Sequence, residues 1–106
     1  MLRPLLHYSI HFLVPIGIAF FFYPKMRLKA ILLLLMGMLI DADHLLANPV
    51  FDANRCSIGF HLLHSYGAIL CYLMLFAFPK IRLIAFGLII HIAADATDCW
   101  LMRIGL

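Results

Sequence analysis

Histidine and aspartate side chains recur at helical spacing in this sequence, and both are common ligands of transition metals. Residues three or four positions apart lie on one face of a helix and can point at a common partner. The sets with this spacing are His7 and His11, Asp41 and His44, His61 and His64, and His91, Asp95 and Asp98. We interpret them as a metal centre.

The number of candidate ligands exceeds what a single zinc ion needs, so we expect one or two divalent ions, zinc first, with iron or manganese as alternatives. The predicted metal ligands are His7, His11, Asp41, His44, His61, His64, His91 and Asp95. The predicted general bases, which would activate metal-bound water, are Asp43 and Asp98. Asp43 lies about 200° around an ideal α-helix from Asp41, so it reaches the centre only if the helix unwinds.

Four apolar segments must position these side chains. The 106 residues are 66% hydrophobic, and the segments at about 4–23, 30–47, 59–78 and 83–102 each approach the ~20 residues that a membrane span needs. Short connections require antiparallel neighbours, so we predict an all-α integral membrane protein, a single domain over 1–106 that forms an up-down bundle of four transmembrane helices. Pro15 predicts a kink in the first helix, and close helix approach is predicted at Gly17, Gly37, Gly67 and Gly87.

Loop charge predicts the orientation of this bundle. The first and third connections carry Lys25, Arg27, Lys29, Lys80 and Arg82, while the other side carries Arg3, Arg55 and Arg103. The positive-inside rule then places those two connections in the cytoplasm, and both termini and the metal centre on the periplasmic side of a bacterial inner membrane. The basic residues behind the net charge of +3 lie mostly in these short connections. Because orientation in the bilayer accounts for them there, we predict no nucleic-acid partner.

On the outer side, Cys56 and Cys99 could form a disulfide in an oxidising compartment. Two buried thiols, or Cys99 as a metal ligand, are the alternatives. A metal centre just below the membrane boundary suits an amphiphilic substrate such as a lipid phosphoester, and Arg55 could hold its phosphate. A solvated or headgroup-contacting Arg55 is the simpler alternative. Ser65 could act as a nucleophile, although such a serine more often bonds the backbone carbonyl four residues back.

Three motifs resemble a known family. Asp41-Ala42-Asp43-His44, His61-Leu62-Leu63-His64-Ser65 and His91-Ile92-Ala93-Ala94-Asp95 are similar to the pattern of small bacterial membrane-bound metal-dependent hydrolases. The stretch from Asn54 to His61 also resembles an uncharacterised bacterial inner-membrane family of about this length. The resemblance implies metal binding, and through the family label it implies hydrolysis.

We therefore expect a membrane metal-dependent hydrolase acting on a lipid or phosphoester, with membrane lipid as its partner and homo-oligomerisation left open. The alternative from another class is a metal-binding or metal-transport protein without catalysis. A b-type haem protein with histidine axial ligands is a third hypothesis, which the neighbouring carboxylates disfavour.

Overall fold

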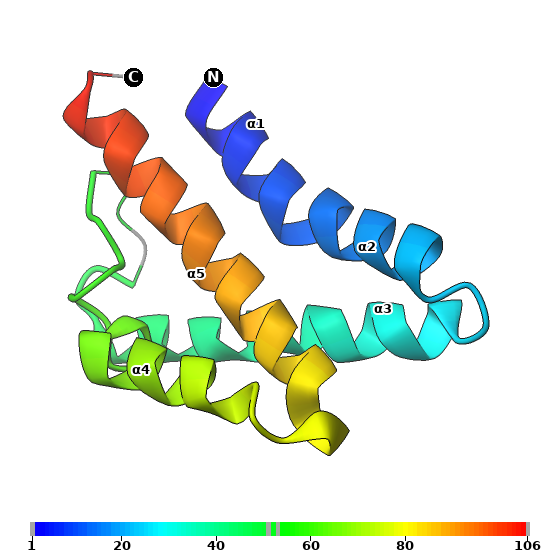
Figure 1. Ribbon diagram of the computed structural model, residues 1–106. Coiled ribbons are helices and arrows are strands. Elements are labelled where there is room, and N and C mark those ends of the chain that lie inside the picture. The colour runs from blue at the N-terminus through cyan, green and yellow to red at the C-terminus, as the bar shows by residue number, and fades with distance from the viewer. Residues whose placement is uncertain (1, 51, 53, 106) are drawn as a thin grey trace.

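The computed structural model describes residues 2–50, 52 and 54–105, and the described chain is all-α (Figure 1). The first helical rod joins α1 (Leu2–Tyr8), the π-helical turn η1 (Ser9–Leu13) and α2 (Val14–Phe22). The second rod joins α3 (Arg27–Leu35) to the 3₁₀ helix η2 (Met36–Leu46). After a long connection come the 3₁₀ turn η3 (Leu62–His64), α4 (Tyr66–Leu75), η4 (Pro79–Ile81) and α5 (Arg82–Arg103).

Helix α5 is the centre of the structure. It packs against α1, α3, η2 and α4, and Figure 1 shows it crossing the second rod at a steep angle. Two apolar clusters surround it. One contains Ala19, Ala30, Leu34 and Ile90, and the other contains Ile40, Tyr72, Leu88 and Ile92. Burial of these side chains fixes the position of α5 relative to the other rods.

The second rod and α5 meet at two glycines. A Cβ atom on Gly37 would lie 2.5 Å from the carbonyl carbon of Gly87, and one on Gly87 would overlap the backbone of Leu34. The backbones therefore approach more closely than any side chain allows. Around Gly17 and Gly67, by contrast, a Cβ would meet no atom within 4 Å. Close approach is confirmed at Gly37 and Gly87, and the prediction is wrong at Gly17 and Gly67.

The first rod departs from α geometry directly before Pro15. The backbone N–H of Val14 donates to the carbonyl of Ser9, five residues back, which defines the π-helical turn. Proline lacks an N–H and crowds the preceding turn, and such irregular turns relieve that crowding. His11 lies within this turn and is buried.

The third apolar segment differs from the prediction of a helix over 59–78. His61 and Ser65 are extended, Leu62–His64 form only a short turn, and α4 spans ten residues, Tyr66–Leu75. Ser65 ends the irregular stretch because its Oγ accepts a hydrogen bond from the Ala68 N–H at 3.2 Å, as a helix N-cap does. The Ser65 hydroxyl therefore does not bond a carbonyl four residues back, and His61 and His64 do not share a helix face.

Among the described residues, two helical segments are long and apolar enough to cross a membrane. They are the first rod, Leu2–Phe22, and the segment Pro79–Arg103, which joins η4 to α5. The core helix of a soluble protein or a signal sequence can also pass this test. Large apolar side chains are exposed on every α-helix, among them Leu5, Phe21, Leu28, Met74 and Trp100. Such an extensive apolar surface is unusual for a soluble monomer.

The glycine crossing gives a direct test. Gly87→Ala is expected to destabilise the protein by about 1–3 kcal/mol, because the new methyl group forces α5 away from Leu34. Gly17→Ala adds a methyl group where there is open space, so helix propensity should leave stability unchanged or raise it by about 0.5–1 kcal/mol. Thermal unfolding of both variants in detergent measures the difference, and equal stability would contradict the close crossing.

Candidate metal centre

Four side chains from three elements converge at one place beside α5. They are Asp41 from η2, His64 from η3, and His91 and Asp95 from α5. The Nε2 atoms of His64 and His91 lie 3.1 Å apart. His91 Nε2 is 2.9 Å from Asp41 Oδ1, and His64 Nε2 is 2.8 Å from Asp95 Oδ2. We call these four residues the first group.

The spacing of these donor atoms matches a tetrahedral metal site. The two remaining measured separations are 3.4 Å, between Asp41 Oδ1 and His64 Nε2, and 3.2 Å, between His91 Nε2 and Asp95 Oδ2. Ligand atoms about 2.0–2.1 Å from a tetrahedral zinc lie about 3.3–3.4 Å from one another. The measured values of 2.8–3.4 Å are close to this. The first group therefore suits a single zinc-sized ion.

A second group lies on the other side of Asp95. The Nε2 atoms of His7 and His11 are 3.0 Å apart, and they lie 3.6 and 3.4 Å from Asp95 Oδ1. Three donor atoms at these separations outline one face of a tetrahedron and leave a fourth position open, which is the pattern of catalytic zinc sites. Because Oδ1 faces this group and Oδ2 faces the first, Asp95 can bridge two ions.

Burial strengthens the case for cations at this position. His11, His64, His91 and Asp95 are all buried. Asp95 Oδ2 lies 2.8 Å from His64 Nε2, but the angles there do not make a hydrogen bond. Two imidazole nitrogens that face each other can share only one proton, and this arrangement occurs twice here. A buried polar atom without a partner costs about 1–3 kcal/mol or more, and coordination of an ion satisfies several at once.

A third group, which contains Asp43, His44 and His61, lies beside the first. His44 Nδ1 is 3.3 Å from Asp43 Oδ1 and 3.0 Å from the carbonyl oxygen of Asp41, to which it can donate. The rings of His44 and His61 stack with their centroids 4.1 Å apart. In the connection before η3, burial and the neighbouring His44 lower the pKa of His61. These surroundings therefore favour the neutral form of the His61 imidazole.

Asp43 holds His64 in place. Its Oδ2 lies 2.7 Å from His64 Nδ1 and accepts a hydrogen bond from the Leu63 backbone N–H at 2.9 Å. Since Nδ1–H donates to Asp43, the lone pair of His64 lies on Nε2 and faces the other three residues of the first group. A carboxylate behind a metal-binding histidine is a frequent arrangement. The sequence predicted that Asp43 reaches the centre only if the helix unwinds. Asp43 is instead buried beside the first group on η2, which is a tighter 3₁₀ helix.

Asp98 lies outside the three groups. Arg3 Nε donates to Asp98 Oδ1 at 3.0 Å, and the second guanidinium nitrogen donates to Oδ2 at 3.3 Å. This two-point contact joins the start of α1 to the end of α5 and aligns His7 and His11 with Asp95. Sequence analysis counted Arg3 only as a loop charge, although its position four residues before His7 was a signal that it faces the same side.

A pocket of about 520 Å³ opens onto the centre. Asp41, whose side chain is 36% exposed, lies at this opening, as do His7, His44 and His61. Arg55 also lines the pocket, but its guanidinium donates to the carbonyls of Pro49 and Val50 at 2.9 and 3.0 Å and lies over the Phe60 ring. The geometry therefore gives Arg55 a role in shaping the connection 47–61.

Two further contacts hold the elements around the centre. A disulfide joins Cys56 to Cys99, with 5.0 Å between their Cα atoms, and ties the connection 47–61 to α5. The Tyr72 hydroxyl donates to the Leu63 carbonyl at 2.7 Å and fixes η3 against α4. Sequence analysis considered the disulfide, whereas it missed Tyr72, because no sequence pattern relates that residue to the turn at Leu63.

A family model described as "Family of unknown function (DUF6122)" matches residues 1–102. No curated protein and no solved structure matches the chain.

Removal of the Asp43 carboxylate tests its contact with His64. Asp43→Asn is expected to weaken zinc affinity about 10–100-fold, because the amide no longer fixes the His64 tautomer. Competition with a chromophoric chelator measures this affinity in detergent. Asp52→Asn is the matched control, since Asp52 lines the pocket outside the three groups. Equal affinity in the two variants would remove the positioning role of Asp43.

Proposed function

The chain belongs to the DUF6122 family, whose function is unknown, and we propose that it is a membrane-embedded hydrolase with two metal ions that cleaves an amphiphilic phosphoester. The observation that carries the proposal is the position of Asp95. Each of its carboxylate oxygens faces a separate pair of imidazoles, His64 and His91 on one side and His7 and His11 on the other.

The donor set suits zinc, with iron or manganese as alternatives, because imidazole and carboxylate ligands serve all three. Asp95 and the imidazoles on either side of it would hold two ions, and such ions would supply a bound water of lowered pKa and positive charge that stabilises a phosphoester under attack. The protein itself supplies the opening at Asp41, the open side of the second group, and the pocket that receives the substrate.

The contacts of Asp43 and Asp98 favour positioning roles over the general-base roles expected from the sequence. Asp43 is committed to His64 and Leu63, and Asp98 is committed to Arg3. Asp43 sets the orientation of a ligand in the first group, and Asp98 sets the position of α1, which carries the ligands of the second group.

Four observations support an outward-facing centre in a membrane. Large apolar side chains are exposed on every α-helix. The segments Leu2–Phe22 and Pro79–Arg103 are long and apolar enough to span a membrane. The disulfide between Cys56 and Cys99 lies at the same end as the pocket, and disulfides persist in oxidising compartments such as the periplasm. Five basic residues in or directly after the connections 23–26 and 76–81 favour a cytoplasmic position for the opposite end; they are Lys25, Arg27, Lys29, Lys80 and Arg82.

A second candidate is a metal-binding protein without catalysis, which one observation favours. The first group provides four protein ligands, and four-coordinate zinc sites of this kind are usually structural. Metal transport is disfavoured because the apolar cluster of Ala19, Ala30, Leu34 and Ile90 fills the space between α2, α3 and α5. That cluster contains no polar relay along which a cation could continue.

Metal content and turnover together test the proposal. Elemental analysis of the purified protein should give two ions per chain, His11→Ala should retain about one, and Asp95→Asn should lose both. Asp52→Asn serves as the control with unchanged content. Hydrolysis of a fluorescent phosphatidylglycerol should require metal and fall at least ~100-fold in His11→Ala. Folded wild-type protein without metal would refute the whole scheme, whereas two ions without turnover would establish the second candidate.

Orientation has its own test. An impermeant amine reagent applied to intact bacteria should leave Lys25 unmodified, because the connection that carries it is proposed to face the cytoplasm. Asn54→Lys places a reporter amine on the exposed connection near the pocket, and this lysine should react from outside. Peptide mapping reads both sites, and the reverse labelling pattern would invert the proposed topology.

A further inference from the structure

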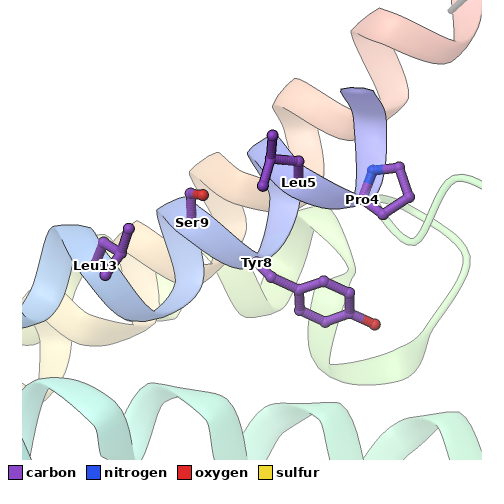
Figure 2. Close-up of a pocket in the computed structure, with 5 residues that line it drawn as sticks. All are labelled: Pro4, Leu5, Tyr8, Ser9 and Leu13. Carbon is purple, nitrogen blue, oxygen red and sulfur yellow. The ribbon is translucent and has the colours of Figure 1, made fainter. Parts of the chain in front are cut away.

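The outer face of α1 and η1 carries a second hollow, which the metal centre does not use. This shallow groove of about 410 Å³ is lined by Pro4, Leu5, Tyr8, Ser9 and Leu13. Figure 2 shows Leu5, Ser9 and Leu13 along one side of the helix, with Tyr8 and Pro4 projecting from other sides. Because Ser9 is small and lies four residues from each leucine, it leaves a notch between two bulky apolar side chains.

The groove and the metal pocket share a wall. Pro4 and Tyr8 line both of them. The Tyr8 ring also packs edge-on against the imidazole of His7, with the ring centroids 5.4 Å apart, and His7 belongs to the second group of metal ligands. A molecule that lies along Leu5 and Leu13 therefore has the metal pocket directly on the other side of Pro4 and Tyr8.

The two hollows differ in polarity in the way that the two ends of an amphiphile differ. The groove is walled by apolar side chains and one serine. The pocket is lined by imidazoles and carboxylates together with Arg3 and Arg55. Two divalent ions would bring four positive charges to ligands that include two carboxylates, Asp41 and Asp95, so the loaded pocket favours an anionic head group.

We propose that this groove binds the alkyl chain of an anionic phosphate amphiphile whose head group lies in the metal pocket. The proposal deepens the proposed function and rests on it. The alkyl chain lies against Leu5, Ser9 and Leu13, and the head group enters between Pro4 and Tyr8. The span from Leu5 to Leu13 is about 12 Å along the helix, so the groove holds a substantial part of a chain. Each methylene buried in the groove strengthens binding through the hydrophobic effect.

The experiment uses full-length protein loaded with cobalt in detergent, because the visible spectrum of cobalt responds to a phosphate that reaches the metal. The two probes are ethyl phosphate and dodecyl phosphate. In the wild-type protein, dodecyl phosphate should change the spectrum at a concentration about tenfold or more below that of ethyl phosphate. Partition of the long chain into micelles contributes to this difference in every variant, so the decisive comparison is between variants.

Ser9→Trp fills the notch and should abolish most of the preference for dodecyl phosphate while leaving the response to ethyl phosphate unchanged. Leu73→Trp is the matched control, since Leu73 is an exposed apolar residue on α4, outside both hollows. It should keep the wild-type preference. Leu13→Gln, at the far end of the groove, is a second variant that should weaken the preference without adding bulk, and it replaces Ser9→Trp if that variant does not bind cobalt.

The outcomes separate the two proposals. An unchanged chain-length preference in Ser9→Trp and Leu13→Gln would overturn the groove as a chain site and leave the phosphoester proposal intact. Cobalt that responds to neither phosphate in the wild-type protein would instead contradict the phosphoester proposal, and the alkyl-chain proposal would fall with it.

Discussion

The structure depends on the cost of placing carboxylates and imidazoles together away from water. Asp95 is buried on the central helix, and its two oxygens face imidazoles of His64 and His91 on one side and of His7 and His11 on the other. An isolated carboxylate at such a depth loses several kcal/mol of solvation. Cations bound by the proposed centre would offset that loss and would satisfy facing nitrogens that cannot all be protonated. This balance explains why so many ionisable groups collect in one place.

The rest of the fold brings the ligands to this point. Gly37 and Gly87 let the second rod approach α5 closely enough for Asp41 to reach His91. Tyr72 and Asp43 hold the turn that carries His64. The pair of Arg3 and Asp98 joins the first rod to α5, and the disulfide does the same for the connection 47–61. Each rod is thus joined to α5 close to the metal centre. These contacts keep the donor atoms of each group near one shared position, where an ion could bind.

The two hollows differ in polarity, and this difference indicates the kind of substrate that would fit them. One is polar and opens onto Asp41 and the second group, and the other is apolar and follows α1. Because Tyr8 borders both, the proposed substrate is an amphiphile that is bound at the membrane boundary. The proposed catalysis places the open coordination position beside His7 and His11. The first group already provides four protein ligands, so its proposed role is to supply charge and rigidity. The two groups would then have different roles.

Composition, spacing and the positions of proline and glycine determined an all-α chain, and residue type and spacing together indicated which histidines and aspartates could gather in one place. Side-chain chemistry and local periodicity carry that information. The sequence could not show that Asp95 lies between two groups, that η2 is a 3₁₀ helix which buries Asp43, or that α4 begins only after His64. Arg3 and Asp98 are 95 positions apart in the chain, and their contact likewise appears only in the folded structure. Helix ends, the choice between 3₁₀ and α geometry, and contacts between distant residues are decided by packing of whole elements against α5, because the local energies that distinguish them are small compared with the energy of burial.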